Sequence, residues 1–184
     1  MDSDITAPTL ARPRALEVIP TGGVLVGIFD LVFAFTFYGL ILKAPALRIF
    51  QSVAAGVLGR PAAIEGGSRT FLLGIVLHFV VATCIATVYY LISLVLPVVL
   101  RYAIPSGLIY GMIAYLGMNY IVIPLSEIGR RTTSKPAWIF TVEIIGHAFL
   151  VGLPLALVAR RSARVHAMKS GHAAPSTTPE ISEA

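Results

Sequence analysis

The chain has 184 residues, of which 57% are hydrophobic and 12% are charged, and its mean hydropathy is +0.85. A soluble domain carries about 25% charged residues. This composition therefore excludes an ordinary soluble domain and indicates an all-α protein with several membrane spans. The net charge of +5 does not indicate nucleic-acid binding, because the basic residues flank apolar stretches, where they would meet lipid headgroups. The single cysteine, Cys84, allows neither an internal disulfide nor a cysteine cluster for zinc.

The first apolar stretch is preceded by an expected disordered tail over residues 1–20. The stretch itself covers about 23–42 and is long enough to cross a bilayer. Its length of about 19 residues exceeds the 7–15 residues of a signal-peptide core. We therefore predict a retained first span and not a cleaved signal.

The connector after the first span predicts a short amphipathic helix at the membrane interface. Its apolar residues recur at helical spacing, with polar side chains between them. The segment after it, GRPAAIEGGSR, is expected to be a loop because of its glycines and proline. The apolar residues of the predicted helix are Leu47, Phe50, Ala54, Val57 and Leu58.

Three further apolar stretches, at about 71–96, 103–125 and 137–159, are also long enough to span a bilayer. Together with the first stretch they predict a four-transmembrane-helix bundle within a membrane domain over 21–160. Residues 161–184 begin with basic residues and continue with small, polar residues and prolines, so we expect a disordered C-terminal tail.

The spans form two pairs of similar plan. Each pair opens with two glycines four residues apart, and the second span of each pair carries one histidine in its first half. This pattern suggests a tandem repeat of two helical hairpins, related about an axis along the membrane normal. Glycines at this spacing permit close packing of helices. The glycines are Gly23, Gly27, Gly107 and Gly111, and the histidines are His78 and His147.

Polar side chains within the spans indicate a shared polar layer, because such residues usually face the protein interior. At 1.5 Å per residue, His78, Glu143 and Asn119 lie about 9–10 Å below the same membrane face. His147 lies one helical turn deeper than Glu143, and Asp30 lies near the middle, at about 18 Å. Each span therefore offers a polar group to the interior.

Within VEIIGHAFLVG, Glu143 and His147 share one face of the last span. The carboxylate is expected to bond the imidazole and to fix its tautomer, with His78 and Asn119 across from the pair. The simplest interpretation is structural: the polar groups bond one another and lock the four helices in one register.

Three other interpretations stay open. The layer, with Asp30 at its centre, suits a small transporter or a proton-handling protein, which would need a homo-oligomer because four spans make a small pathway. His78 and His147 also lie at depths that would allow axial ligation of haem b. Glu143 with both histidines would supply ligands to a metal, but no spaced metal motif supports this. We predict no cofactor and no enzymatic activity, because no nucleophile motif or phosphate-binding loop is present.

The stretches LHFVVATCIATVYY and EIIGHAFLVGLPLALVARR resemble the YagU-like family of bacterial inner-membrane proteins of uncharacterised function. The resemblance covers the second to fourth spans, and it implies a multi-pass protein of the bacterial inner membrane without implying a reaction. Basic residues divide equally between the two sides of the bundle. We expect cytoplasmic termini because Arg160, Arg161 and Arg164 form a dense cluster directly after the last span.

Overall fold

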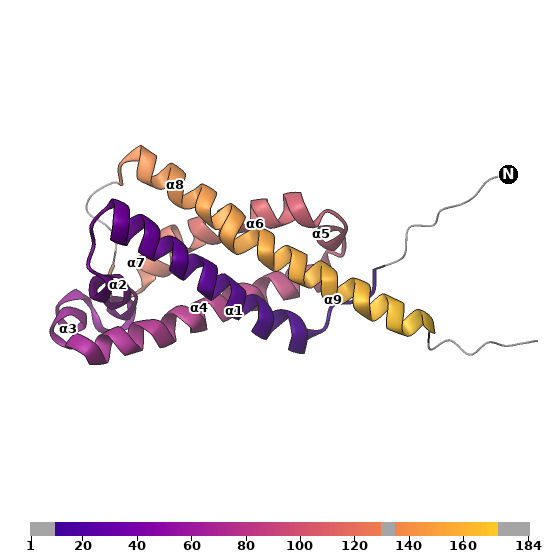
Figure 1. Ribbon diagram of the computed structural model, residues 1–184, viewed down its shortest axis with the longest axis horizontal. Coiled ribbons are helices and arrows are strands. Elements are labelled where there is room, and N and C mark those ends of the chain that lie inside the picture. The colour runs from indigo at the N-terminus through magenta and orange to yellow at the C-terminus, as the bar shows by residue number, and fades with distance from the viewer. Residues whose placement is uncertain (1–9, 130–134, 173–184) are drawn as a thin grey trace, which may run out of the picture.

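Four long helical segments form an elongated bundle (Figure 1). The computed structural model describes residues 10–129 and 135–172. Within these ranges, four segments are long and apolar enough to cross a membrane, which confirms the predicted all-α bundle. They are called spans one to four in chain order and cover Ala15–Ile41, Gly67–Val95, Ala103–Leu125 and Ala137–Ser170.

The connector between spans one and two is longer than the one between spans two and three. Segments marked η are π-helical. In chain order the elements are α1 (Ala15–Ala34), η1 (Phe35–Ile41), α2 (Ala46–Leu58), α3 (Arg60–Glu65), α4 (Gly67–Val95), α5 (Val98–Arg101), α6 (Ala103–Gly117), η2 (Met118–Val122), α7 (Ile123–Leu125), α8 (Ala137–His147), η3 (Ala148–Gly152) and α9 (Leu153–His172).

The first span begins earlier than predicted. Helix α1 starts at Ala15, within the tail over 1–20 that was expected to be disordered. Its start is held against the last helix by side-chain hydrogen bonds. The backbone N–H of Arg14 donates to the Ser162 hydroxyl at 3.1 Å, and that hydroxyl donates to the Glu17 carboxylate at 2.6 Å. Residues 1–9 of the predicted tail lie outside the described ranges.

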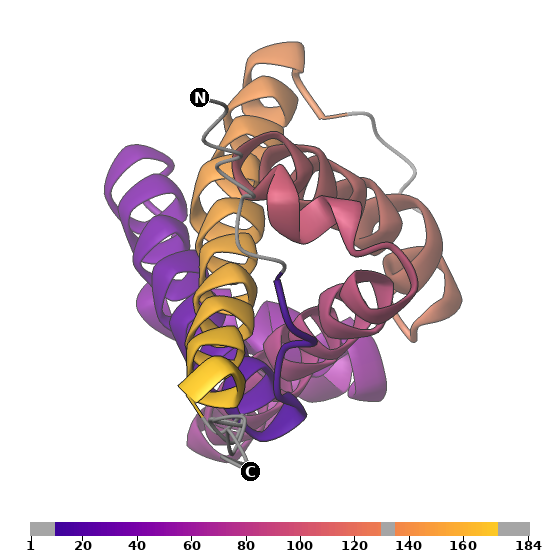
Figure 2. The same cartoon turned by 90° about the vertical axis from the view of Figure 1, so that its right-hand side faces the viewer.

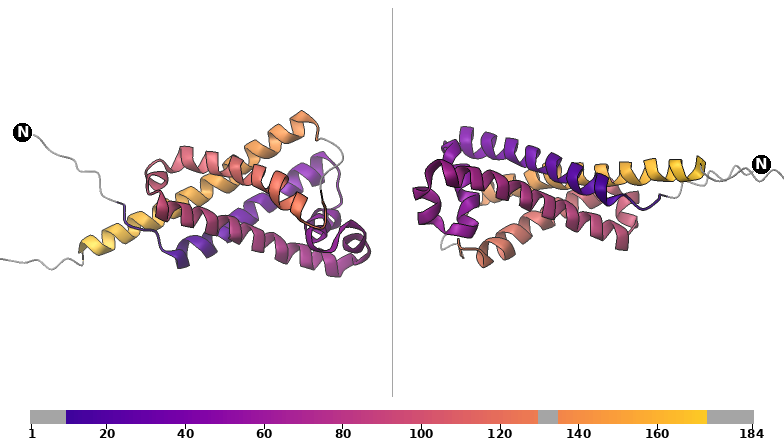
Figure 3. Two further views of the ribbon diagram at one scale, coloured as in Figure 1. Left: turned by 180° about the vertical axis from the view of Figure 1, so that it is seen from behind. Right: turned by 90° about the horizontal axis from the view of Figure 1, so that it is seen from below.

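The predicted amphipathic helix is present as α2. Phe50 and Ala54 are buried, and the helix packs against the first turns of α4. Leu47, Val57 and Leu58 remain exposed, where a membrane interface would cover them. Figure 3 shows α2 and α3 beside the start of α4. They lie at the opposite end of the bundle from the N-terminal end of α1 and the C-terminal end of α9.

The segment predicted as a loop after α2 is a short helix, α3, so that prediction is wrong. Gly59, with a φ of +76°, redirects the chain at the end of α2. Pro61 then stands in the first turn of α3, where its fixed φ suits a helix and its missing N–H costs nothing.

The last span continues beyond the predicted boundary at 159, and the predicted tail over 161–184 is therefore corrected. Helix α9 reaches His172, because the alanines, arginines, lysine and methionine after the apolar stretch all favour a helix. Ala159 and Ala163 are fully buried in the core. Residues 173–184 lie outside the part of the chain that the structure describes.

Glycines allow spans one and two to approach closely. A Cβ at Gly23 would crowd the side chain of Thr83, and a Cβ at Gly27 would overlap the ring of Phe79. Both neighbours belong to α4, so the first predicted glycine pair packs within its own hairpin.

The second glycine pair acts in the same way between spans three and four. A Cβ at Gly111 would overlap the backbone carbonyl of His147, and Gly107 lies against Gly152. Each glycine pair thus packs on the histidine-bearing span of its own hairpin, as two hairpins of similar plan require. The duplication itself stays a prediction. Viewed from the end in Figure 2, α9 runs between α1 and α6.

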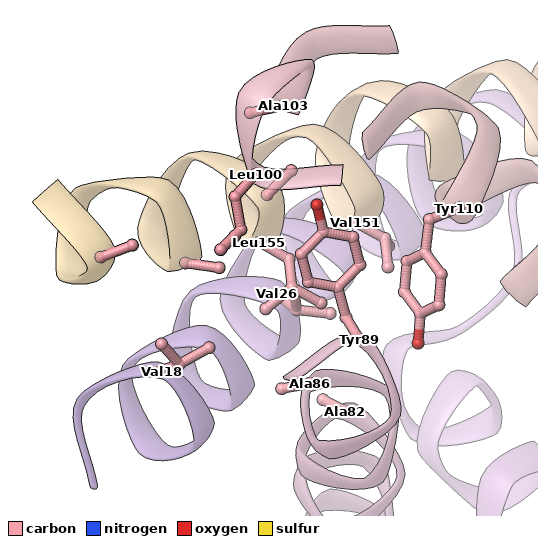
Figure 4. Packing of buried hydrophobic residues seen from close by; sticks show 13 residues of the cluster. Val18, Val26, Ala82, Ala86, Tyr89, Leu100, Ala103, Tyr110, Val151 and Leu155 are labelled. Carbon is pink, nitrogen blue, oxygen red and sulfur yellow. The ribbon is translucent and has the colours of Figure 1, made fainter. Parts of the chain in front are cut away.

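The half of the bundle near the termini holds the hydrophobic core (Figure 4). Two buried tyrosines fill its centre, and their hydroxyls are satisfied locally. The Tyr110 hydroxyl donates to the Ile85 carbonyl at 2.6 Å, and the Tyr89 hydroxyl lies 3.3 Å from the Ser106 hydroxyl. In every span, the core residues lie nearer the termini than the predicted polar residue, so apolar packing closes the bundle on that side.

Candidate functional site

A partly open cavity of about 460 Å³ lies in the other half of the bundle, among all four spans and α2. Its volume falls within the range of about 300–1,000 Å³ that is usual for small-molecule sites. The structure brings every predicted polar residue to the wall of this one cavity. These residues are Asp30, His78, Asn119, Glu143 and His147.

Glu143 is the most deeply buried of them, with an exposed fraction of 1%. Its carboxylate accepts hydrogen bonds from the hydroxyls of Tyr38 and Tyr115, the latter at 2.5 Å, and forms an ion pair with the ammonium of Lys135. The partners come from span one, from span three and from the segment just before α8. A buried carboxylate is tolerated when its oxygens are paired in this way, so this group ties three parts of the chain together.

The expected bond between the Glu143 carboxylate and the His147 ring is wrong. The Nδ1 of His147 instead donates to the backbone carbonyl of Glu143, at 2.9 Å. The carboxylate is directed toward Tyr38, Tyr115 and Lys135, while the imidazole lies against the ring of Tyr115 with 5.1 Å between centroids. The two residues share a helix face, as predicted, but their side chains bind different partners.

Asp30 is the carboxylate that faces the histidines. One of its oxygens lies 4.0 Å from Nδ1 of His78, and the other lies 3.7 Å from Nε2 of His147. The side chains of Asp30, His78 and His147 are 28%, 13% and 19% exposed. They therefore form a cluster on the cavity wall whose members are more exposed than Glu143.

Both histidines are oriented by backbone carbonyls. Nε2 of His78 bonds the carbonyl of Gly27 at 2.9 Å, and Nδ1 of His147 bonds the carbonyl of Glu143 at 2.9 Å. A carbonyl only accepts, so each of these nitrogens carries a hydrogen. The opposite nitrogen of each ring faces Asp30. It presents a lone pair when the ring is neutral and an N–H when the ring is charged, so the cluster can take up a proton.

Asn119 lines the same cavity, and its amide donates to the backbone carbonyl of Tyr115 at 3.0 Å. It thus caps its own helix backbone and does not bond Glu143 or His147 among the described contacts. The remaining wall is largely aromatic and aliphatic, with Phe33 and Phe50 on the side of span one and α2, and also includes Arg48, Ser52 and Lys135. The site combines an ionisable cluster with an apolar surface.

Turns of π-helix interrupt three spans beside the cavity. Tyr38 lies within η1, Asn119 lies within η2, and η3 begins directly after His147. A π turn shifts the helical hydrogen bonds by one residue and is frequently found at functional sites. These turns rotate the following side chains away from their positions in an ideal helix.

All three partners of Glu143 were absent from the predicted site: Tyr38, Tyr115 and Lys135. Lys135 was assigned to the connector before the last span, although a buried acid two helical turns away is a signal for a nearby cation. The sequence spacing could not reveal Tyr38, since its position depends on the π turn in η1.

The haem and metal alternatives stay open as predictions, although the geometry favours neither. A haem iron held by His78 and His147 would lie between their rings, but the carboxylate of Asp30 faces both rings there. In the described ranges, no group of three or more histidine, cysteine or acidic side chains has the arrangement of a metal site.

No family model matches the chain, and neither a curated protein nor a solved structure matches it. The resemblance to the YagU-like family therefore stays a prediction. Four long apolar helices fit an integral membrane protein in contact with a lipid bilayer. Any more specific function has to be argued from the cavity.

Proposed function

We propose that this chain is a small proton-handling membrane protein, in which Asp30, His78 and His147 take up and release protons within the cavity. The observation that supports this proposal is the approach of one carboxylate to two imidazole nitrogens that the backbone leaves unbonded. Ionisable groups inside a bundle are costly unless they serve a function or pair with one another. These three are also accessible from the cavity.

The predicted polar layer then divides into two parts with different roles. The Glu143 group is buried and joined to Tyr38, Tyr115 and Lys135, which supports the structural interpretation for this part. The Asp30 cluster is partly exposed to the cavity, which supports proton handling. Only the second part is assigned a chemical role.

The apolar core limits how protons could move. It fills the bundle between the Asp30 cluster and the termini with packed apolar side chains. Transfer across the membrane therefore requires a second conformation, as in an alternating-access transporter built from two repeats. The π turns in spans one, three and four are places where such a change could occur without unfolding a helix.

We also propose a bacterial inner membrane with cytoplasmic termini as the location. The support is the cluster of Arg160, Arg161 and Arg164, which follows the apolar part of span four within α9. In this orientation, the cavity and α2 lie toward the periplasmic side.

Proton flux into liposomes tests the proposal. The protein is reconstituted with a pH-sensitive dye inside, a pH step is applied outside, and potassium with valinomycin balances the charge. The wild-type protein should conduct protons faster than empty liposomes. Asp30→Asn should reduce the flux to the rate of empty liposomes, because the amide cannot exchange a proton.

Glu65→Gln is the matched control, since this carboxylate lies exposed at the end of α3, outside the cavity. It should leave the flux at the wild-type rate. The proposal is wrong if wild-type liposomes behave as empty ones, or if Asp30→Asn conducts protons as fast as the wild type.

A further inference from the structure

A second cavity of about 510 Å³ adjoins the first, between α2, α4 and span three. Its wall is largely aliphatic, with Leu77 and Val81 from α4 and Met118 and Val122 from η2. The two cavities share part of their walls, including Arg48 of α2 and Val81. An apolar cavity therefore lies directly beside the polar cavity that holds the Asp30 cluster.

This apolar cavity lies where two spans separate. Helix α4 packs on α1 and α2, whereas span three packs on span four, and the main helix contacts do not include α4 with η2 or α7. At this level α2 stands between them, and its Gly56 carbonyl accepts a hydrogen bond from the Glu127 N–H, just after span three. In a bilayer the gap between α4 and span three would be reached sideways from the hydrocarbon.

The charges on the wall select the occupant. Arg48 and Arg60 line the apolar cavity, and no acidic side chain lines it. Among the described residues neither arginine forms an ion pair. The Arg48 guanidinium donates a hydrogen bond to the Gln51 amide oxygen at 3.3 Å. Two guanidinium groups beside an apolar cavity favour an anionic headgroup attached to a hydrocarbon chain.

The direction of the cavity agrees with such a ligand. Arg48 and Arg60 belong to α2 and α3 at the end of the bundle, where the amphipathic helix would meet the membrane interface. Val81 lies one helical turn deeper than Leu77 along α4. A headgroup at the arginines would thus place its chain beside these residues, directed toward the membrane interior.

We propose that this second cavity binds a single-chain carboxylate, such as a long-chain fatty acid, which enters from the bilayer between α4 and span three. A volume of about 510 Å³ suits one chain and not the two chains of a phospholipid. Arg48 lines both cavities, so a carboxylate bound at Arg48 would lie beside the cavity that holds the Asp30 cluster. The inference stands on residues other than the three that carry the proton proposal.

Photolabelling tests this site. The full chain is placed in phosphatidylcholine nanodiscs with palmitate that carries a diazirine on its chain, and the labelled peptides are mapped by mass spectrometry. Labelling should concentrate near Leu77 and Val81 in α4 and near Met118 and Val122 in η2. An excess of unlabelled palmitate should abolish it, whereas palmitate methyl ester and phosphatidic acid should compete far less.

Variants separate the headgroup from the chain. The double variant Arg48→Gln/Arg60→Gln should reduce labelling at least about tenfold, the loss expected when charge-assisted hydrogen bonds are removed. Lys43→Gln is the control, since this exposed cation precedes α2 but lines neither cavity. Val122→Trp should block labelling by filling the cavity from a position that is 46% exposed, where folding tolerates the change.

Several outcomes would overturn the inference. One is label that spreads over the outward faces of all spans and is not displaced by unlabelled palmitate. Another is labelling of the double arginine variant at the wild-type level. A third is competition by the methyl ester or by phosphatidic acid that is as strong as competition by palmitate. Asp30→Asn should label as the wild type does, because Asp30 does not line the second cavity. Normal labelling without proton flux would reject the proton proposal alone, and flux without specific labelling would reject the fatty-acid site alone.

Discussion

At the scale of single residues, Glu143 illustrates how a bundle can bury an acid. The Lys135 ammonium and the hydroxyls of Tyr38 and Tyr115 surround a carboxylate that is only 1% exposed. Removing one member of a buried ion pair costs more than the pair itself contributes, because the remaining charge loses its partner. Glu143 is therefore needed for the fold, whether or not the cavity is active.

Glu143→Gln should lower the folded yield in detergent and destabilise the protein. The lost ion pair with the Lys135 ammonium sets the cost, which should lie near or below the lower end of about 3–5 kcal/mol, since the Lys135 side chain is 20% exposed. Thermal unfolding in detergent measures this. Tyr115→Phe, which removes one hydrogen bond and leaves the ion pair, should cost less. Wild-type yield and stability for Glu143→Gln would contradict the structural role.

The sequence was sufficient to predict five of the polar residues that line the cavity, but not how they pair. Polar residues are rare in the spans, so Asp30, His78 and Glu143 stand out, and depth places His78 and Glu143 near one level with Asp30 deeper. Which side chains pair depends on how each helix is rotated about its axis, and a π turn changes that rotation for the residues that follow it. The ring of His147 faces Asp30 of α1, and not Glu143 of its own helix, a pairing between helices that spacing along one helix does not reveal.

At the scale of helices, close packing depends on one glycine that the spacing did not reveal. Gly107 and Gly111 were predicted from their spacing, but Gly152, on the facing helix, has no partner glycine four residues away. A Cβ at Gly152 would overlap the Gly107 carbonyl and the Gly111 backbone. Backbone atoms cannot move aside as a flexible side chain can, so this contact requires a glycine.

Gly152→Ala should destabilise the protein by about 1–3 kcal/mol, the cost of overpacking a tight contact. Gly117→Ala offers a matched control, because Gly117 is also helical and a Cβ there would meet nothing within 4 Å. The control should be neutral or stabilising by up to about 1 kcal/mol, since alanine favours a helix over glycine. Melting temperatures in one detergent compare the two variants, and equal melting temperatures would show that spans three and four do not pack as described.

Helix ends were predicted less well than helix positions, for a physical reason. Hydropathy indicates where a helix can contact hydrocarbon, but backbone hydrogen bonding continues wherever the residues favour a helix. Span four therefore extends as α9 to His172, beyond its apolar stretch. In α3, a proline that indicated a loop instead begins a helix.

At the scale of the whole molecule, the bundle consists of two unlike halves. The half near the termini is a packed apolar core, and the half near α2 holds two adjoining cavities with the ionisable groups. Each span contributes to both halves, so a rotation of one hairpin against the other would change the cavities and the core together. Such coupling is what alternating access between two repeats requires.

The two halves should differ in access to water, which cysteine labelling can measure. In a background of Cys84→Ser, Asn119→Cys should react with a membrane-impermeant thiol reagent added from the side of α2, because position 119 lines the open cavity. Ser93→Cys should not react from that side, since Ser93 is 1% exposed and lies in the half near the termini. Reaction of both cysteines would show that the apolar core does not close the bundle. Labelling of Asn119→Cys in intact cells would in addition place α2 on the outer side and the termini in the cytoplasm.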